Sequence, residues 1–134
     1  MPQRKDDPTI LDDDLLWRRI VNNPHMVKIE PDGKIRPSSA VFLDGYTGEV
    51  SVHLARLTNF EKIRLDKPDV GVVEINAGYP RSLGQTIVAD PTENDPSHTL
   101  ICPPDKPTKK RKIDARLMAE RSQWRLFPKE YRTE

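Results

Sequence analysis

Three groups of side chains in this sequence have residue types and spacings that could bind or transform a ligand. The first is the segment Arg36-Pro37-Ser38-Ser39. An arginine and two hydroxyls just ahead of an apolar run could bind a phosphate or a carboxylate, because a guanidinium matches these anions and hydroxyls add donors. The alternative is local turn chemistry, since serine hydroxyls often bond to their own backbone.

The second group is Glu49, Ser51 and His53, which alternate with apolar residues and so share one face of a predicted strand. If that face lines a cleft, Glu49 could act as an acid or base and His53 as a proton carrier. If it faces water, it is an ordinary solvated sheet surface.

The third group is His98, which opens a predicted strand directly after the loop Asp95-Pro96-Ser97. Loops often deliver a histidine to a cleft, although a lone histidine can also be structural. We expect the polar residues of the three groups to share one concavity. The predicted ligand-binding residues are Arg36, Ser38, Ser39, Ser51 and His98, and the catalytic candidates are Arg18, Ser39, Glu49 and His98.

Motifs that would indicate other chemistry are absent. The chain has no GxGxxG, GxxxxGK[ST], HExxH, CxxC or GxSxG pattern. The single cysteine, Cys102, ends an apolar run and is expected to be a buried apolar residue. We therefore predict neither a cofactor nor a metal.

The elements that must position these residues are short strands. The clearest lies at 49–54, where Val50, Val52 and Leu54 face one side, and it is predicted to form a hairpin with 40–43 through a loop at 44–48. Further strands are predicted at 15–21, 26–30, 70–75, 86–89 and 98–102. The segment 77–84 is predicted to be a loop or bulge.

Two helices complete the prediction. Thr58 and Glu61 have capping-box spacing, which predicts a short helix from Thr58 to about residue 66. A second helix, rich in basic residues, is predicted from 108 to about 124. Since no long helical crossover separates the strands, we predict an α+β fold with a mixed, largely antiparallel sheet of about five or six strands.

Charge divides the chain into three predicted parts. Residues 1–14 form an acidic leader, 15–102 the α+β body, and 103–134 a basic linker and helical tail. Residues 1–102 hold 12 basic and 16 acidic side chains, a net charge of −4, whereas 103–134 hold 10 basic and 5 acidic, a net charge of +5. The leader is expected to be solvated, or to dock onto a basic partner or the basic tail.

The tail could neutralise phosphates or contact an acidic protein surface. The alternative is a solvated, partly frayed helix. The residues predicted to make such contacts are Lys109, Lys110, Arg111, Lys112 and Arg116.

The sequence predicts a cytoplasmic location. No apolar stretch approaches the roughly 20 residues needed to cross a bilayer, and the charged N-terminus lacks the apolar segment of a signal peptide. A lone cysteine is typical of a reducing compartment.

Part of the sequence resembles a known family. The runs LWRRI at 16–20, RPSSAVF at 36–42 and EVSV at 49–52, with the turn at 95–98, are similar to small uncharacterised bacterial proteins with an LWRRI…RPSSAAF…GELSV layout. The resemblance covers about the first 100 residues and implies a bacterial origin but no activity.

A remoter similarity is to the ADP-ribosyltransferase and RES-type superfamily. There an early strand carries an arginine, a later strand opens with serines, and a glutamate follows. The matching residues here would be Arg18 or Arg19, Ser38 or Ser39, and Glu49 or Glu74, at a shorter spacing than in that superfamily.

Three kinds of function follow from these features. The first is a bacterial accessory module that binds a protein partner or an anionic ligand through the body, with the basic tail on nucleic acid or an acidic surface. The second is an enzyme acting on NAD or another nucleotide, with Arg18, Ser39 and Glu49 as anion clamp, positioner and electrostatic stabiliser. The third is a structural subunit of a larger assembly.

Overall fold

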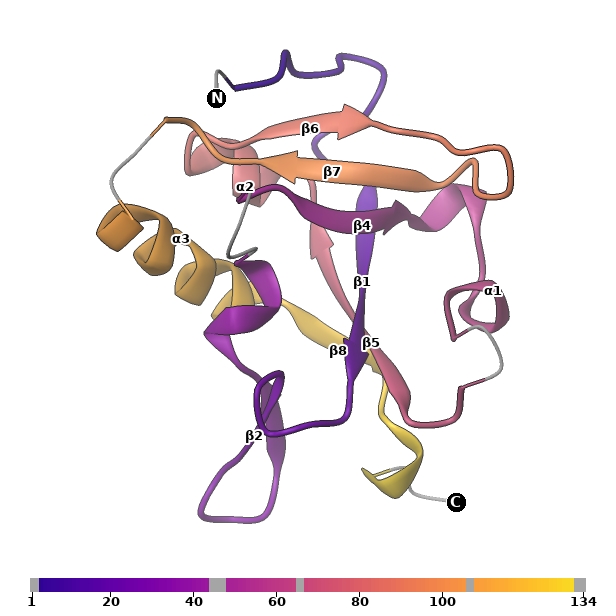
Figure 1. Cartoon of the computed structure of the whole chain (residues 1–134), viewed down its shortest axis with the longest axis vertical. Coiled ribbons are helices and arrows are strands. Elements are labelled where there is room, and N and C mark those ends of the chain that lie inside the picture. Colours follow the sequence, from indigo (N-terminus) through magenta and orange to yellow (C-terminus); the bar gives the residue numbers. More distant parts are fainter. Residues whose placement is uncertain (1–2, 44–47, 65–66, 106–107, 132–134) are drawn as a thin grey trace.

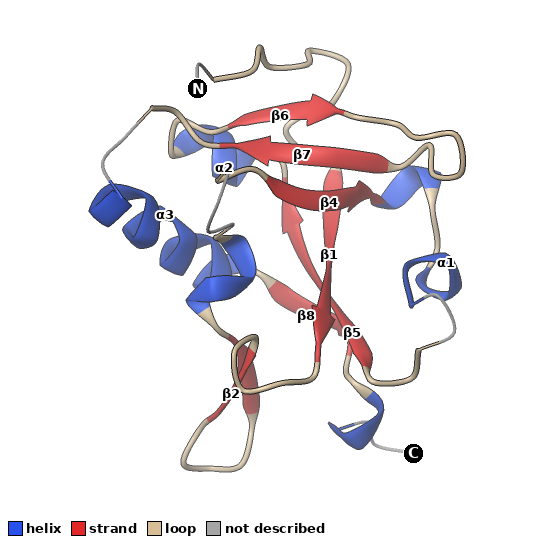
Figure 2. Ribbon diagram, viewed as in Figure 1, coloured by secondary structure: helices blue, strands red, loops and turns tan. Residues whose placement is uncertain are grey.

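The predicted α+β fold is confirmed by the computed structural model, which describes residues 3–43, 48–64, 67–105 and 108–131 (Figures 1 and 2). Six strands form one antiparallel sheet in the order β6-β7-β4-β1-β5-β8, and β2 and β3 form a separate hairpin. The strands are β1 (Leu15–Val21), β2 (Val27–Ile29), β3 (Ile35–Pro37), β4 (Val50–Leu54), β5 (Val70–Asn76), β6 (Thr86–Ala89), β7 (His98–Cys102) and β8 (Gln123–Leu126). The helices are α1 (Phe60–Arg64), α2 (Gly78–Ser82) and α3 (Thr108–Arg121), with 3-10 turns η1 (Ser39–Phe42), η2 (Ala55–Leu57) and η3 (Lys129–Tyr131).

The sheet has an apolar face and a polar face, as the alternation in β4 predicts. Val50, Val52 and Leu54 are buried, whereas Ser51 and His53 between them are half-buried. Cross-strand partners share a face, so the pairing of His53 with His98 in β7 places both imidazoles on the polar face.

The sheet splays between β1 and β4. These two strands share only two registered pairs, Leu16 with Leu54 and Trp17 with His53, whereas β1 pairs with β5 along its whole length. In Figure 1, β4, β7 and β6 run crosswise to β1 and β5. Arg18 lies at this divergence, and its guanidinium donates from Nη1 to the Ser51 carbonyl (2.8 Å) and from Nε to the Val41 carbonyl (3.0 Å).

The predicted hairpin at 39–55 is wrong. Ser39–Phe42 forms the 3-10 turn η1, and β4 pairs with β1 and β7 instead. A strand would bury only every second residue, but both Val41 and Phe42 are buried, and a helical turn packed against α3 allows this. Of the predicted loop at 44–48, residues 44–47 lie outside the described part of the chain.

Three other local predictions also need correction. The segment 77–84, predicted as a loop or bulge, contains α2. Helix α1 is capped by Asn59, whose Oδ1 accepts from the Lys62 amide (2.9 Å), rather than by Thr58. The C-terminal helix ends at Arg121, and the residues after it form β8, which pairs with β5.

The leader and the basic helix both pack against the body. Ile10 is buried in the core, and the Asp7 amide donates to the Ile87 carbonyl in β6 (2.9 Å). On α3, Ala115, Met118 and Ala119 join the same core. The chain from Gln3 to Tyr131, where described, therefore contributes to one fold rather than to a body with two solvated ends.

Arg81 in α2 holds the leader in place. Its guanidinium forms ion pairs with Asp6 (Nε–Oδ1, 3.0 Å) and Asp12 (Nη1–Oδ1, 2.8 Å), and its Nη2 donates to the carbonyls of Asp7 and Ile10. The acidic leader thus docks onto an arginine of the body, not onto the basic helix.

An Arg81→Ala variant should lose about 2–3 kcal/mol of unfolding free energy, because several charge-assisted hydrogen bonds to a half-buried guanidinium disappear together. Urea denaturation followed by circular dichroism measures the loss. Arg56→Ala is the matched control, because Arg56 makes one exposed ion pair with Asp14; it should cost less than about 1 kcal/mol. Equal losses in the two variants would contradict the anchoring role.

Candidate functional site

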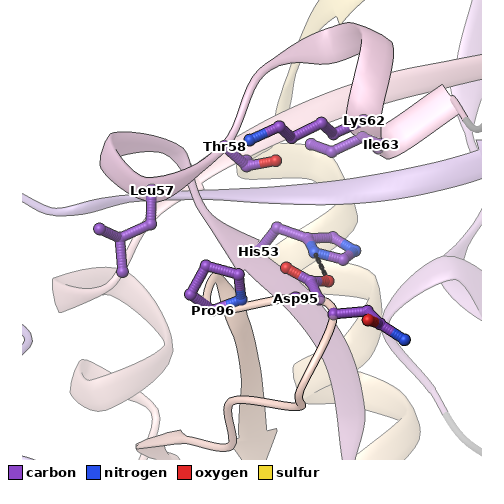
Figure 3. A pocket seen from close by; sticks show the side chains of 8 residues that line it. His53, Leu57, Thr58, Lys62, Ile63, Asp95 and Pro96 are labelled. Carbon is purple, nitrogen blue, oxygen red and sulfur yellow. Dashed lines mark ion pairs between the residues drawn. The ribbon is translucent and has the colours of Figure 1, made fainter.

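A polar cavity of about 360 Å³ opens on the polar face of the sheet where β1 and β4 splay apart. It lies between β1, β4, β7, helix α1 and the loop that precedes β7. Its lining residues are Arg18, Arg19, Ser51, His53, Lys62, Ile63, Asn94, Asp95 and His98. A hollow of about 270 Å³ adjoins it and shares His53, Lys62 and Asp95 (Figure 3).

His98, which lines the cavity, contacts both Asp90 and Ser51. Its Nδ1 lies 2.9 Å from the Asp90 backbone carbonyl and 3.1 Å from Oδ2 of the same residue. Because a carbonyl oxygen only accepts, Nδ1 carries the hydrogen. In a neutral ring, Nε2 then holds the lone pair, and the Ser51 hydroxyl at 3.2 Å donates to it.

His53 is held in the same manner by the turn before β7. Its Nδ1 lies 3.1 Å from Asp95 Oδ2 and 3.1 Å from Ser97 Oγ. The Ser97 hydroxyl donates its one hydrogen to Asp95 Oδ1, so it must accept from His53. In the neutral ring, Nε2 of His53 is therefore a lone-pair acceptor. In Figure 3, Asp95 and Lys62 lie on opposite sides of this imidazole.

Local turn chemistry explains how Asp95 reaches both neighbours. Its Oδ1 accepts from the Ser97 amide (3.0 Å) two residues along, which is an Asx turn. Burial opposes ionisation of Asp95, but the hydrogen bonds from Ser97 and the nearby His53 hold the pKa of this carboxyl below its usual range. Asp95 is thus a carboxylate at neutral pH.

Burial lowers the pKa of His53, and the charge of Arg19 and the neighbouring His98 act in the same direction, while Asp95 opposes them. The two imidazoles meet edge to face with ring centroids 6.0 Å apart. His53 is therefore neutral at neutral pH and presents an unprotonated Nε2.

This shift makes stability depend on pH. The unfolded chain binds a proton at His53 more readily than the native protein does, so the contribution of His53 is complete above the ordinary value of 6.5 and is lost as pH falls below it. Between about pH 7.5 and about pH 5, wild-type protein should lose more unfolding free energy than His53→Gln. Urea denaturation at both pH values measures this difference, and identical losses would contradict it.

Two cations, Arg19 and Lys62, line the cavity in addition to Arg18. Among the described residues that line it, Asp95 is the one carboxylate. Arg19 Nη1 donates to the Ile63 carbonyl (3.3 Å), which is a neutral acceptor. Neither Arg19 nor Lys62 forms an ion pair with any described residue.

The structure brings some predicted site residues together and separates others. Arg18, Ser51 and His98 all line the cavity. Arg36 and Ser39 instead line a different hollow, of about 460 Å³, with Arg116 and Trp124, and the residues predicted to share one concavity do not all do so.

The remaining predicted residues have local partners. Ser38 is buried, and its hydroxyl donates to the His25 carbonyl (2.5 Å), a structural contact with a residue far along the chain that neither the anion site nor the local turn chemistry predicted. Glu49 forms an ion pair with Arg4 in the leader (2.9 Å). Arg18, Ser39 and Glu49, the anion clamp, positioner and stabiliser expected for an ADP-ribosyltransferase-like site, therefore have separate surroundings.

The predicted basic contact residues lie on α3. Lys109 and Lys112 are exposed, Lys110 lies 3.9 Å from the buried Asp114, and Arg116 lies 3.8 Å from Glu120. Arg111 is half-buried. The outer face of α3 thus keeps exposed lysines while its inner face packs on η1.

Two other kinds of chemistry receive no support from the described residues. Cys102 is buried, and burial raises the pKa of its thiol to about 12, so it is not a nucleophile at neutral pH. Among residues 3–43, 48–64, 67–105 and 108–131, no group of His, Cys, Asp and Glu side chains is arranged to hold a metal ion.

The site residues predicted from the sequence do not include Lys62 or Asp95, nor Asp90 and Ser97, which contact the two histidines; Arg19 enters only through the remoter family similarity. Asp95 and Ser97 belong to the turn Asp95-Pro96-Ser97, whose spacing is typical of an Asx turn. Arg19 and Lys62 reach the cavity through strand splaying and the position of α1, and Asp90 reaches His98 through the pairing of β6 with β7. No local pattern indicates these contacts.

Comparisons with protein-family models, curated proteins and solved structures gave no match to this chain. In the part of the chain that the structure describes, no helix combines the length and the apolar character required to span a bilayer.

Proposed function

We propose that this protein binds a small anionic ligand, or an anionic group of a partner, in the cavity between β1, β4 and α1. The observation that carries the proposal is that Arg19 and Lys62, which form no ion pair with a described residue, line the cavity beside the imidazoles of His53 and His98. A guanidinium and an ammonium bind phosphate or carboxylate strongly, and hydroxyl and amide groups add orientation. Ser51 and Asn94 supply such groups.

The shape of the cavity supports a ligand of limited size. A volume of about 360 Å³ lies at the lower end of the range for small-molecule sites. The adjoining hollow, lined by Leu57, Thr58 and Pro96, gives room for a less polar extension. The ligand that fits best is a phosphate or carboxylate joined to a short, partly apolar group.

Isothermal titration calorimetry of the full chain with inorganic phosphate, a phosphate monoester and a dicarboxylate tests this proposal. We expect at least one of these anions to bind at a single site, with an affinity that falls as sodium chloride is added. If none of the three binds at low ionic strength, the proposal is wrong.

The enzyme alternative is tested in the same instrument. NAD carries a pyrophosphate, so it should bind if the protein is an ADP-ribosyltransferase-like enzyme, and labelled NAD should then yield a product. Failure of NAD to bind, with simple anions still bound, would remove that alternative and leave the anion-binding proposal intact.

A contact between the basic helix and nucleic acid is a separate prediction. Lys109→Ala/Lys112→Ala removes two exposed charges without touching the packed face of α3. It should weaken binding to duplex DNA or RNA about tenfold at low salt, measured by fluorescence anisotropy. Arg125→Ala/Lys129→Ala, with two exposed cations elsewhere, is the matched control. Equal affinity of wild-type protein and the α3 variant would contradict a role for this helix.

A further inference from the structure

We propose that Ser51 is a nucleophile, activated by His98 and positioned through Asp90, and that the cavity transfers an acyl group from an ester that also carries an anionic group. The inference rests on the proposed function for the anionic part of the substrate. The reacting centre itself, however, is defined by the Asp90–His98–Ser51 contacts, which do not involve Arg19 or Lys62.

The three groups have the connectivity that a serine nucleophile requires. Asp90 accepts from Nδ1 of His98 through its carboxylate (3.1 Å) and its backbone carbonyl (2.9 Å), which fixes the tautomer and the ring orientation. Nε2 then faces the Ser51 hydroxyl at 3.2 Å as an acceptor, the arrangement of a base ready to take the proton.

The fold gives this arrangement rigidity and access. Ser51 and His98 are on adjacent antiparallel strands, β4 and β7, whose register pairs Ser51 with Leu100 and His53 with His98. Both side chains are half-buried and line the cavity, so a substrate placed there would meet the Ser51 hydroxyl directly.

The proposed ester cleavage needs water and no other reagent. Ser51 Oγ bonds to the ester carbonyl carbon as its proton passes to His98 Nε2, and the charge on the carbonyl oxygen develops beside the cations of the cavity. The carbon–oxygen bond to the alcohol breaks, and His98 returns the proton to that alcohol. Water then attacks the acyl carbon as one of its protons passes to His98. The bond from this carbon to Ser51 Oγ breaks, His98 returns the proton to Oγ, and the acid is released.

An uncharged serine reagent separates this inference from anion binding. Diisopropyl fluorophosphate forms a bond from Ser51 Oγ to phosphorus with loss of fluoride and a proton, and mass spectrometry of peptides locates the adduct. We expect one adduct, at Ser51, that is absent from Ser51→Ala and present in Ser39→Ala. Excess inorganic phosphate should protect the wild-type protein.

Variants of the partner residues test activation itself. His98→Gln should slow labelling by about 100-fold or more. Asp90 is a positioning residue, so Asp90→Asn should slow labelling about tenfold while leaving phosphate affinity unchanged, a split that a merely structural role would not produce. No adduct at Ser51, or an undiminished rate in a folded His98→Gln protein, would overturn the inference.

A second measurement serves if His98→Gln does not fold. The thiol of a Ser51→Cys variant would face His98, so iodoacetamide should alkylate it at neutral pH at least about tenfold faster than the thiol of Ser39→Cys. Buried Cys102 is the internal reference for slow alkylation. Equal alkylation rates for Ser51→Cys and Ser39→Cys would overturn the proposal that Ser51 is an activated nucleophile. Intact phosphate binding by the same samples would show that the proposed anion-binding function still holds.

Discussion

Replacing both cations of the cavity, in the double variant Arg19→Ala/Lys62→Ala, should weaken anion binding about 100-fold. Each charge-assisted hydrogen bond to a bound phosphate or carboxylate contributes about 1.5–3 kcal/mol, so loss of two costs at least about 3 kcal/mol. Calorimetry with whichever anion binds the wild-type protein measures the change. Circular dichroism confirms that the variant is folded.

The matched control removes an arginine and a lysine elsewhere. Arg36 lines the other hollow and forms an ion pair with Glu30, and Lys67 is exposed. Arg36→Ala/Lys67→Ala changes the net charge of the chain by the same amount and should leave the affinity within about twofold of wild type. If the control variant loses anion binding and the cavity variant does not, the anion site lies between β3 and α3, near Ser39.

Ending the chain after residue 105 should prevent cooperative folding. Truncation removes Met118 from the core and the Trp124 indole, which packs against that core and donates to the Ile35 carbonyl (3.2 Å). It also removes β8 and leaves β5 as an unpaired edge. The lost burial is comparable with the whole unfolding free energy of a domain of this size, about 5–15 kcal/mol.

Thermal denaturation followed by circular dichroism checks this result. The truncated chain should show no cooperative transition, whereas Lys109→Ala/Lys112→Ala, which changes only exposed charge on α3, should melt close to wild type. A cooperative transition in the truncated chain would contradict this account and would show that residues 103–134 are a separate tail.

The strands of the sheet could be predicted because their signals are local. Val50, Val52 and Leu54 alternate with polar residues, which predicts a strand with one buried face. The β-branched run at 70–75 predicts a buried strand without any information about the rest of the chain. Gln123–Leu126 could not be assigned in this way. Its burial pattern is mixed, and it becomes a strand because β5 offers an open edge beside it.

The candidate site was only partly predictable for the same reason. Ser51 and His98 stood out by residue type and by position on strands. Asp90 directly follows the predicted strand at 86–89 and has no local signal of its own, and only the antiparallel return from β6 to β7 brings it to His98. The chemistry of Ser38 suggests a ligand, but its hydroxyl donates to the His25 carbonyl, a contact that no local pattern predicts.

The charge of the acidic leader correctly suggests that it binds a basic group, but it does not show which basic group. Asp6 and Asp12 bind one guanidinium, that of Arg81, although the chain offers a far more basic segment in α3. A single half-buried arginine with two carboxylates and two carbonyls around it outweighs exposed lysines, because its contacts are fixed and less screened by water.

The central claim, that an anion binds beside His53 and His98, is tested most directly by nuclear magnetic resonance of the histidine rings during a phosphate titration. His25 is exposed and lines neither the cavity nor its adjoining hollow, so it is the internal reference. The ring signals of His53 and His98 should shift together and saturate while those of His25 stay constant. Unmoved His53 and His98 signals, or equal unsaturable shifts in all three rings, would contradict the account.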